Sequence, residues 1–225
     1  MKINIKFLSV FAMSIIMFSC KKEKVTADMR PKDIDGNVYD TVVIGTQTWM
    51  TQNLKTTKYN DGTSITTDLN DAAWAIINVG AFTVYNANST FNTTYYNDIY
   101  GKLYNWHAVN TGKLAPKGWH VPSDAEWTTL INYLGGTSIA GAALKDTSQL
   151  WQTPNLATNS SKFKALPGGF RNSNYGDIRL TCYFWTSSLV SPSTPMMLYL
   201  YANDALVHRA TGNPNEGFSV RCIRD

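Results

Sequence analysis

The sequence predicts an α+β domain, because its clearest helix signal lies in the middle of the chain and strand signals lie on both sides. The helix begins at a capping box, Ser123 to Glu126, and ends at a glycine pair, Gly135-Gly136. Its apolar residues recur at the spacing of one helical face. They are Trp127, Leu130, Ile131 and Leu134.

Strands are expected where β-branched and aromatic residues gather between turn residues. Residues 38–50 indicate two short strands joined at Gly45, and Asn203-Asp204 indicates the turn of a later hairpin. Because strands precede and follow the helices, we expect the N- and C-terminal strands to pair. The later strand segments are 183–188, 196–201, 205–210 and 217–223.

Shorter helices are expected on either side of the capped one. The second central helix runs from a cap at Thr137 or Ser138 through Lys145, and a third covers residues 71–78. The inward residues are expected to be Ile139, Ala142 and Ala143 in the former, and Ala73, Trp74 and Ile77 in the latter.

The N-terminus indicates export. Residues 1–19 have the basic start, short apolar run and small final residue of a lipoprotein signal peptide. Cys20 is then the expected lipidation site, residues 20–32 a flexible tether, and residues 33–225 the domain. An ordinary signal peptide with an incidental Cys20 is the alternative. A lipidated Cys20 predicts a cell-envelope protein, an outer-membrane lipoprotein, whose partner is the bilayer.

Most of the net positive charge of the chain comes from the residues that precede Arg30. The sequence has 20 Lys and Arg against 16 Asp and Glu, and five of the basic and two of the acidic residues precede Arg30. The remaining part therefore carries 15 basic and 14 acidic residues. A nearly neutral domain offers no basic surface for nucleic acid, so we expect no nucleic-acid partner.

Two cysteines, Cys182 and Cys222, lie in the expected domain. An exported protein with two cysteines can pair them in a disulfide. Both lie in apolar, strand-like stretches, where free buried cysteines are also common. The two alternatives stay open at this point.

Ordered motifs resemble the Fibrobacter succinogenes major paralogous domain family. The resemblance covers about residues 34–225, apart from residues 68–94, which we treat as an insertion. The motifs are Asp35-Gly36-Asn37, Tyr39, Thr41-Val42, Ile44-Gly45, Gln47, Trp49-Met50, Asn53-Leu54, Tyr100-Gly101, Leu103-Tyr104-Asn105-Trp106, Gly118 to Ser123, Glu126-Trp127, Leu166-Pro167, Gly169, Arg171, Tyr183 to Ser188 and Gly217 to Cys222.

This resemblance implies a C-type-lectin-like fold, related also to formylglycine-generating enzymes. C-type lectins hold calcium between a Pro-containing loop and a Trp-Asn-Asp run; residues 213–216 offer only Asn-Pro-Asn-Glu, which a turn explains. The enzymes use two closely spaced cysteines, whereas Cys182 and Cys222 are 40 positions apart. We therefore expect neither a lectin-type calcium site nor the cysteine chemistry of the formylglycine-generating enzymes.

Three histidines, His107, His120 and His208, are the remaining candidates for chemistry. A zinc site would need them to converge. Without a cysteine or carboxylate at ligand spacing, buried hydrogen-bonded histidines are the favoured interpretation. We assign no catalytic residue, no metal and no cofactor.

Aromatic residues outside the family-like motifs are the candidate binding residues. Tyrosine and tryptophan rings stack on sugar faces, while amides and hydroxyls bond to sugar edges. We therefore expect a non-catalytic, lipid-anchored binding protein that recognises a polysaccharide or a surface protein. The alternatives are a structural component without a glycan ligand and an enzyme related to formylglycine-generating enzymes. The candidate residues are Trp74, Tyr85, Tyr95, Tyr96, Trp151 and Tyr175.

Overall fold

A computed structural model describes residues 30–86 and 93–225. The expected signal peptide, the lipidation site Cys20 and most of the tether lie outside these residues. The described elements are β1 (Thr41–Ile44), β2 (Gln47–Met50), α1 (Asp71–Ile76), β3 (Phe82–Thr83), α2 (Thr93–Tyr100), β4 (Leu103–Tyr104), α3 (Trp106–Val109), β5 (Trp119–His120), α4 (Asp124–Tyr133), α5 (Thr137–Leu144), β6 (Gly168–Arg171), β7 (Tyr175–Ile178), β8 (Thr181–Ser191), β9 (Thr194–Tyr201), β10 (His208–Thr211) and β11 (Ile223–Arg224).

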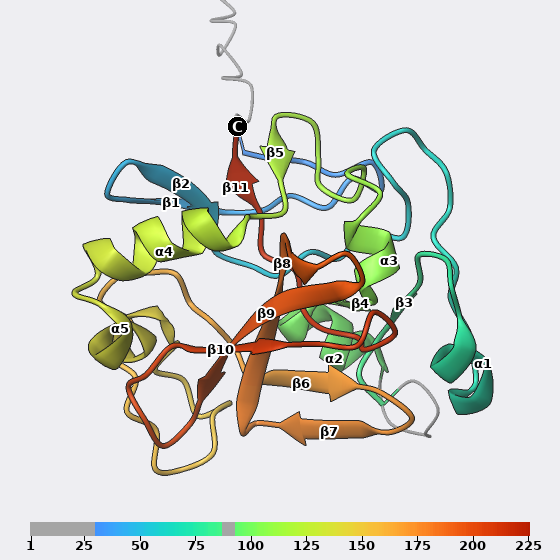
Figure 1. The fold of residues 1–225 in the computed structure, drawn as a ribbon. Helices are drawn as coiled ribbons and strands as arrows, with labels where there is room; N and C mark the ends of the chain where they lie inside the picture. The colour runs from blue at the N-terminus through green and yellow to red at the C-terminus, as the bar shows by residue number, and fades with distance from the viewer. Residues whose placement is uncertain (1–29, 87–92) are drawn as a thin grey trace, which may run out of the picture.

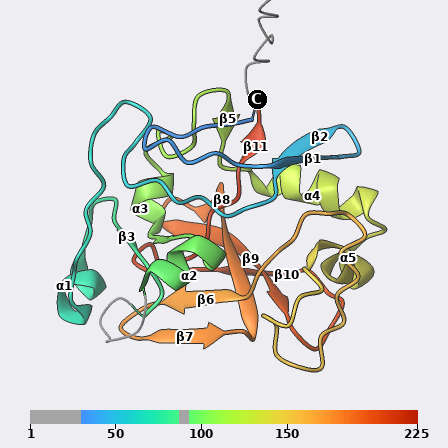
Figure 2. The same ribbon diagram turned by 180° about the vertical axis from the view of Figure 1, so that it is seen from behind.

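The described strands form three sheets, and the mixture of helices and strands confirms the α+β class. Their orders are β1-β2-β11-β5, β10-β9-β8-β6-β7 and β3-β4. The pairing is antiparallel except between β6 and β8. Figures 1 and 2 show β5 and β11 at one end of the molecule and β6 and β7 at the opposite end.

The N- and C-terminal strands pair, as the sequence predicts. Ile223 of β11 lies opposite Trp49 of β2 and opposite His120 of β5, both antiparallel. The last strand is shorter than residues 217–223, because Gly217, Phe218 and Ser219 form only isolated bridges before the chain reaches β11. The hairpins β1–β2 and β9–β10 also form as expected.

Helix α4 confirms the capping box. Ser123 Oγ accepts a hydrogen bond from the Glu126 amide, and the Glu126 carboxylate accepts one from the Ser123 amide. Trp127, Leu130 and Ile131 are buried, and Leu134 packs against the same core cluster. The helix ends where Gly135 and Gly136 adopt φ values of 98° and 96°.

Helix α5 corrects two predictions. Its N-cap is Gly136, without a side-chain cap, so neither Thr137 nor Ser138 has that role. Its buried residues are Ala140, Gly141, Ala143 and Leu144, whereas Ile139 is exposed. Gly141 explains why this face of α5 is the buried one. A Cβ at Gly141 would lie 2.1 Å from the Leu206 oxygen, so the loop that contains Leu206 packs directly against this face.

Helix α1 spans Asp71–Ile76, capped by the Asn70 side chain. Trp74 is fully buried as expected, while Ala73 and Ile77 are partly exposed. Within the part of the chain that the structure describes, no helix is long and apolar enough to span a membrane.

Candidate ligand-binding site

Four of the six candidate aromatics gather in one place. We call Tyr85, Tyr95, Tyr96, Tyr100 and Tyr175 the tyrosine cluster. Ring centroids are 5.3 Å apart for Tyr85 and Tyr175, 5.4 Å for Tyr85 and Tyr96, and 5.5 Å for Tyr95 and Tyr96. Tyr96 stacks on Tyr100 at 6.1 Å. Offset and tilted pairs at these distances are the favourable arrangements of aromatic rings.

The chain assembles this cluster from three segments. Tyr85 follows β3, three tyrosines lie on α2, and Tyr175 begins β7. Spacing on α2 places Tyr96 and Tyr100 one turn apart on one face. Burial raises the pKa of Tyr100 to about 12, so its hydroxyl stays protonated and remains a hydrogen-bond donor.

A surface depression, the tyrosine hollow, adjoins this cluster. It has a volume of about 690 Å³ and is lined by Tyr95, Tyr96, Tyr100, Gln149 and Arg179 among others. Tyr95 is about half exposed, so an aromatic ring faces solvent at its edge. Aromatic walls with an amide and a guanidinium are the features of a site that stacks on and hydrogen-bonds to a polar ligand.

A second depression, the cationic hollow, is lined by Thr83 and Val84, which directly precede Tyr85 in the chain. Its volume is about 510 Å³, and Lys102 and Arg171 line it together with Asp68. The Thr83 hydroxyl, which also lines it, is hydrogen-bonded to the Tyr175 hydroxyl at 2.7 Å. This hydrogen bond links the lining of the cationic hollow to a member of the tyrosine cluster.

Arg171 lies between two of the candidate aromatic residues, Trp74 and Tyr175. Its guanidinium lies between two rings, 4.3 Å from the Trp74 centroid and 5.1 Å from the Tyr175 centroid. Such stacking stabilises a desolvated guanidinium by up to about 2 kcal/mol. Trp74, Arg171 and the tyrosine cluster consequently form one continuous stack across the molecule.

Trp74 and Trp151 require a correction as platform residues. Both are essentially inaccessible to solvent, so neither presents a free face to a sugar. Trp151 packs in the core cluster of α4 and α5, and its Nε1 donates to the Ala165 oxygen at 3.1 Å. A tryptophan that buries its ring and satisfies its N–H is a core residue.

The two cysteines are free and buried. Cys182 belongs to the core cluster around α4, and Cys222 to the cluster around Tyr39 and Trp106. The free-thiol alternative is therefore the one that the structure describes. Burial raises the pKa of each thiol to about 12, which leaves almost no reactive thiolate at neutral pH.

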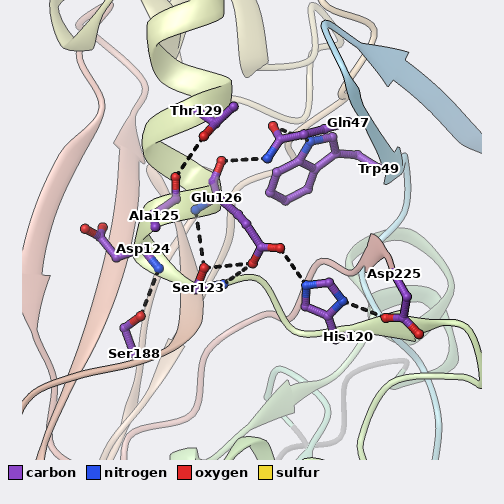
Figure 3. Close-up of polar contacts among 10 residues, drawn as sticks. All are labelled: Gln47, Trp49, His120, Ser123, Asp124, Ala125, Glu126, Thr129, Ser188 and Asp225. Carbon is purple, nitrogen blue, oxygen red and sulfur yellow. Dashed lines mark hydrogen bonds and ion pairs between the residues drawn. The ribbon is translucent and has the colours of Figure 1, made fainter.

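A separate polar network surrounds His120 (Figure 3). Its Nδ1 lies 2.7 Å from Asp225 Oδ1, and its Nε2 lies 2.7 Å from Glu126 Oε1. Ser123 Oγ donates to the other oxygen of Glu126 at 2.8 Å. Since both ring nitrogens face carboxylates and the hydroxyl bonds to Glu126, no hydroxyl is placed on the imidazole as a triad needs. The network joins β5, β11 and the start of α4.

The other histidines are also hydrogen-bonded and only partly buried. His107 Nε2 lies 3.0 Å from Asn215 Oδ1, and His208 Nε2 lies 2.8 Å from Asp204 Oδ2. Among the described residues, no group of three His, Cys, Asp or Glu side chains is placed to hold a metal ion.

The sequence alone does not predict a site role for several residues that line the two hollows; they include Tyr100, Lys102, Gln149, Arg171 and Arg179. Tyr100 and Arg171 lie in family-like motifs, which favour a role in the scaffold. One signal is present: Lys102 lies between Gly101 and the apolar run Leu103-Tyr104, and Arg171 directly follows Phe170. Charged residues in such places are buried only with a partner.

The described residues form an α+β domain with two surface depressions, one of them lined by tyrosine residues. The family model of the Fibrobacter succinogenes major domain matches residues 42–224. Because the match covers well over half of the 225 residues, the chain belongs to this family. Comparisons with curated proteins and with solved structures gave no match.

Proposed function

We propose that this protein is a non-catalytic, lipid-anchored protein of the outer membrane whose C-type-lectin-like domain binds a polysaccharide at the tyrosine hollow. The gathering of Tyr85, Tyr95, Tyr96 and Tyr175 into one cluster beside a solvent-open hollow carries the proposal. These four residues come from three segments of the chain, around Tyr85, on α2 and at the start of β7.

The wall chemistry supports a sugar polymer. Pyranose rings present apolar C–H faces that stack on tyrosine, and their hydroxyls bond to amides, guanidinium groups and phenols. Tyr95, Tyr96, Gln149 and Arg179 supply these groups around one opening. An open depression also suits an internal unit of a chain, because both ends of the polymer can leave it.

Affinity electrophoresis tests this proposal. The full chain, purified in detergent, is run through gels that contain neutral or acidic envelope and plant polysaccharides. We expect at least one polymer to retard it, and Tyr96→Ala to weaken this binding by about tenfold through the lost stacking. Tyr133→Ala is the matched control, because Tyr133 is two-thirds exposed on α4. If no polymer retards the wild-type protein, polysaccharide binding is wrong.

A protein partner is the second candidate. Ile76 and Val79, at the end of α1, are exposed by 81% and 53%, which is unusual for two neighbouring aliphatic residues. A partner captured from envelope extract would favour this candidate if Tyr96→Ala leaves capture unchanged and Ile76→Asp abolishes it.

A further inference from the structure

Buried cations differ in how completely the protein satisfies them. A charged group removed from water needs hydrogen bonds or counter-charges in compensation. Within the part of the chain that the structure describes, the buried cationic side chains are Lys102, Lys145, Arg171 and Arg221.

Lys145 is fully satisfied. An ammonium group has three donors, and each of them has a backbone acceptor here. The acceptors are the oxygens of Tyr201, Ala202 and Asp204, at 2.7, 2.9 and 2.7 Å from Nζ. No donor is left for a ligand.

Arg221 is satisfied in the same way. Its Nε and Nη2 donate to Asn53 Oδ1, and its Nη1 donates to the backbone oxygens of Met50 and Phe163. A longer contact joins Nη2 to the Lys164 oxygen at 3.5 Å. All three nitrogens are therefore used.

Lys102 and Arg171 are incompletely satisfied. Among the described residues, Lys102 Nζ has a single acceptor, Asn97 Oδ1, at 2.6 Å. Arg171 Nη2 donates to the Leu69 oxygen at 2.7 Å and to Asp71 Oδ1 at 3.2 Å. The buried Nε of Arg171 has no partner within the same described residues. Both side chains thus keep unused donors.

These two side chains line the same hollow. The cationic hollow brings Lys102 and Arg171 together, and threonine hydroxyls form much of the remaining wall. The satisfied cations, Lys145 and Arg221, do not line it. The threonines are Thr57, Thr67, Thr83 and Thr93.

We propose that the cationic hollow binds the carboxylate-bearing sugar of an acidic polysaccharide, a hexuronate unit, through the Lys102 ammonium group, with the positive charge of the buried Arg171 guanidinium beside it. This inference rests on the proposed function and names its substrate class. Charge-assisted hydrogen bonds from ammonium and guanidinium groups to a carboxylate are among the strongest in proteins. The threonine hydroxyls pair with the sugar hydroxyls, and Phe82 and Val84 supply the apolar part of the wall.

The acidic residues nearby argue against a bare anion. Asp68 lines the hollow, and the half-exposed carboxylate of Asp71 is an ion-pair partner of Arg171. This charge pattern weakens the attraction for inorganic phosphate or sulfate. A sugar acid matches it better, because its hydroxyls donate to Asp68 while its carboxylate faces Lys102.

The neighbouring tyrosine hollow extends the same site. Thr93 lines the cationic hollow and Tyr95, two residues later on α2, lines the tyrosine hollow. A hydrogen bond joins the hydroxyls of Thr83, in the lining of the cationic hollow, and Tyr175, in the tyrosine cluster. In the proposed complex, one unit of the polymer stacks on tyrosine and a uronate unit meets the cations.

Ligand chemistry provides a test that leaves the protein unchanged. The detergent-purified full chain is run in gels containing polygalacturonate, its carboxyl-reduced form, or dextran sulfate. We expect polygalacturonate to retard the protein, with an affinity at least about tenfold higher than for the other two polymers, because a charge-assisted bond to the carboxylate is lost in both. Equal binding of the carboxyl-reduced polymer or of dextran sulfate would overturn the inference.

A charge variant localises the effect. Lys102→Met should lower the affinity for polygalacturonate by about tenfold and leave the affinity for the carboxyl-reduced polymer unchanged. Lys113→Met removes the same charge from an exposed pair with Asp61 and should bind as wild type. Unchanged binding by a folded Lys102→Met protein would overturn the assignment of Lys102. If this variant does not fold, the three-polymer comparison decides.

The outcomes separate the two proposals. Binding that depends on Tyr96 but not on carboxylates would overturn the uronate inference and leave polysaccharide binding intact. The absence of retardation by any polymer would overturn both.

Discussion

Arg171 and Arg221 are both 1% exposed, and each stacks on two aromatic rings. They differ in their hydrogen bonds. Arg221 uses every nitrogen on protein acceptors, whereas Arg171 leaves Nε without one among the described residues. Burial of a charge alone therefore does not distinguish scaffold from site. The two arginines differ instead in the number of donors that have no acceptor.

Their positions in the chain explain the difference. The acceptors of Arg221 come from the end of β2, from Asn53 and from the loop at residues 163–164, so one guanidinium connects segments that are distant in sequence. Among the described residues, the hydrogen bonds of the Arg171 guanidinium go to residues 69 and 71, at the start of α1. Arg221 organises the core, and Arg171 supports one edge of a hollow.

The largest expected effect is that of Arg221→Met. It removes the guanidinium and leaves at least three buried oxygens without a donor, so we expect the free energy of unfolding to fall by about 3–5 kcal/mol. Urea denaturation followed by tryptophan fluorescence measures this change. Arg224→Met, at an exposed arginine over the Trp119 ring, is the control and should change stability by less than about 1 kcal/mol. A loss as small as that of the control would remove the distinction between the two arginines.

A smaller effect is expected for Arg171→Met. Methionine keeps contact with Trp74 and Tyr175, and only the Leu69 oxygen and the half-exposed Asp71 lose a partner. We expect a loss of about 1–2 kcal/mol in the same urea experiment. A loss equal to that of Arg221→Met would show that Arg171 is equally structural.

The smallest expected effect is the pH dependence of stability that arises from the hydrogen bonds of the partly exposed His120. Burial alone would lower the pKa of His120, but its hydrogen bonds to Asp225 and Glu126 raise it overall. Burial alone would raise the pKa of Glu126, but hydrogen bonds from Ser123 and His120 lower it overall. The contribution of His120 to the stability of the fold is thus complete below its ordinary pKa of 6.5 and is lost at higher pH. The contribution of Glu126 to stability is complete above its ordinary pKa of 4.5 and is lost at lower pH.

Thermal unfolding between pH 4 and pH 9 tests this window. We expect wild type to exceed His120→Gln by about 1 kcal/mol between pH 4.5 and 6.5, a small value because solvent screens the exposed partners. The advantage should shrink on both sides of this range. A constant difference across the whole range would contradict a charged His120.

Local signals predicted the scaffold well. The capping box, apolar face and glycine stop of α4 all lie within fourteen residues, from Ser123 to Gly136. Residues close together in the sequence therefore determine where this helix begins, which face it buries and where it ends. On helix α5 the predicted inward face is right at Ala143 and wrong at Ile139, because the orientation of the helix depends on Gly141 meeting the Leu206 oxygen. A contact between residues 65 positions apart leaves no periodic signal.

The site was predicted only in part, for the same reason. Of the six aromatic residues predicted to bind a ligand, Tyr95 and Tyr96 line the tyrosine hollow, and Tyr85 and Tyr175 contact one another beside it. Their role in binding stays a prediction, whereas Trp151 is a core residue whose Nε1 donates to a backbone oxygen. Lys102 and Arg171 look like any charged residues in the sequence. Their importance depends on which donors remain unused, and the folded neighbours alone determine that.

The arrangement of the two chain ends determines how the hollows would be presented. The described chain starts at Arg30 beside the end of β11, opposite the end that carries β6 and β7 (Figures 1 and 2). With the proposed lipid on Cys20, the ten residues up to Arg30 allow a stand-off of at most about 35 Å from the bilayer. A lipid there would tether the domain near the β11 end and leave the opposite end, where β6 contributes Arg171 to the cationic hollow, as the part farthest from the tether.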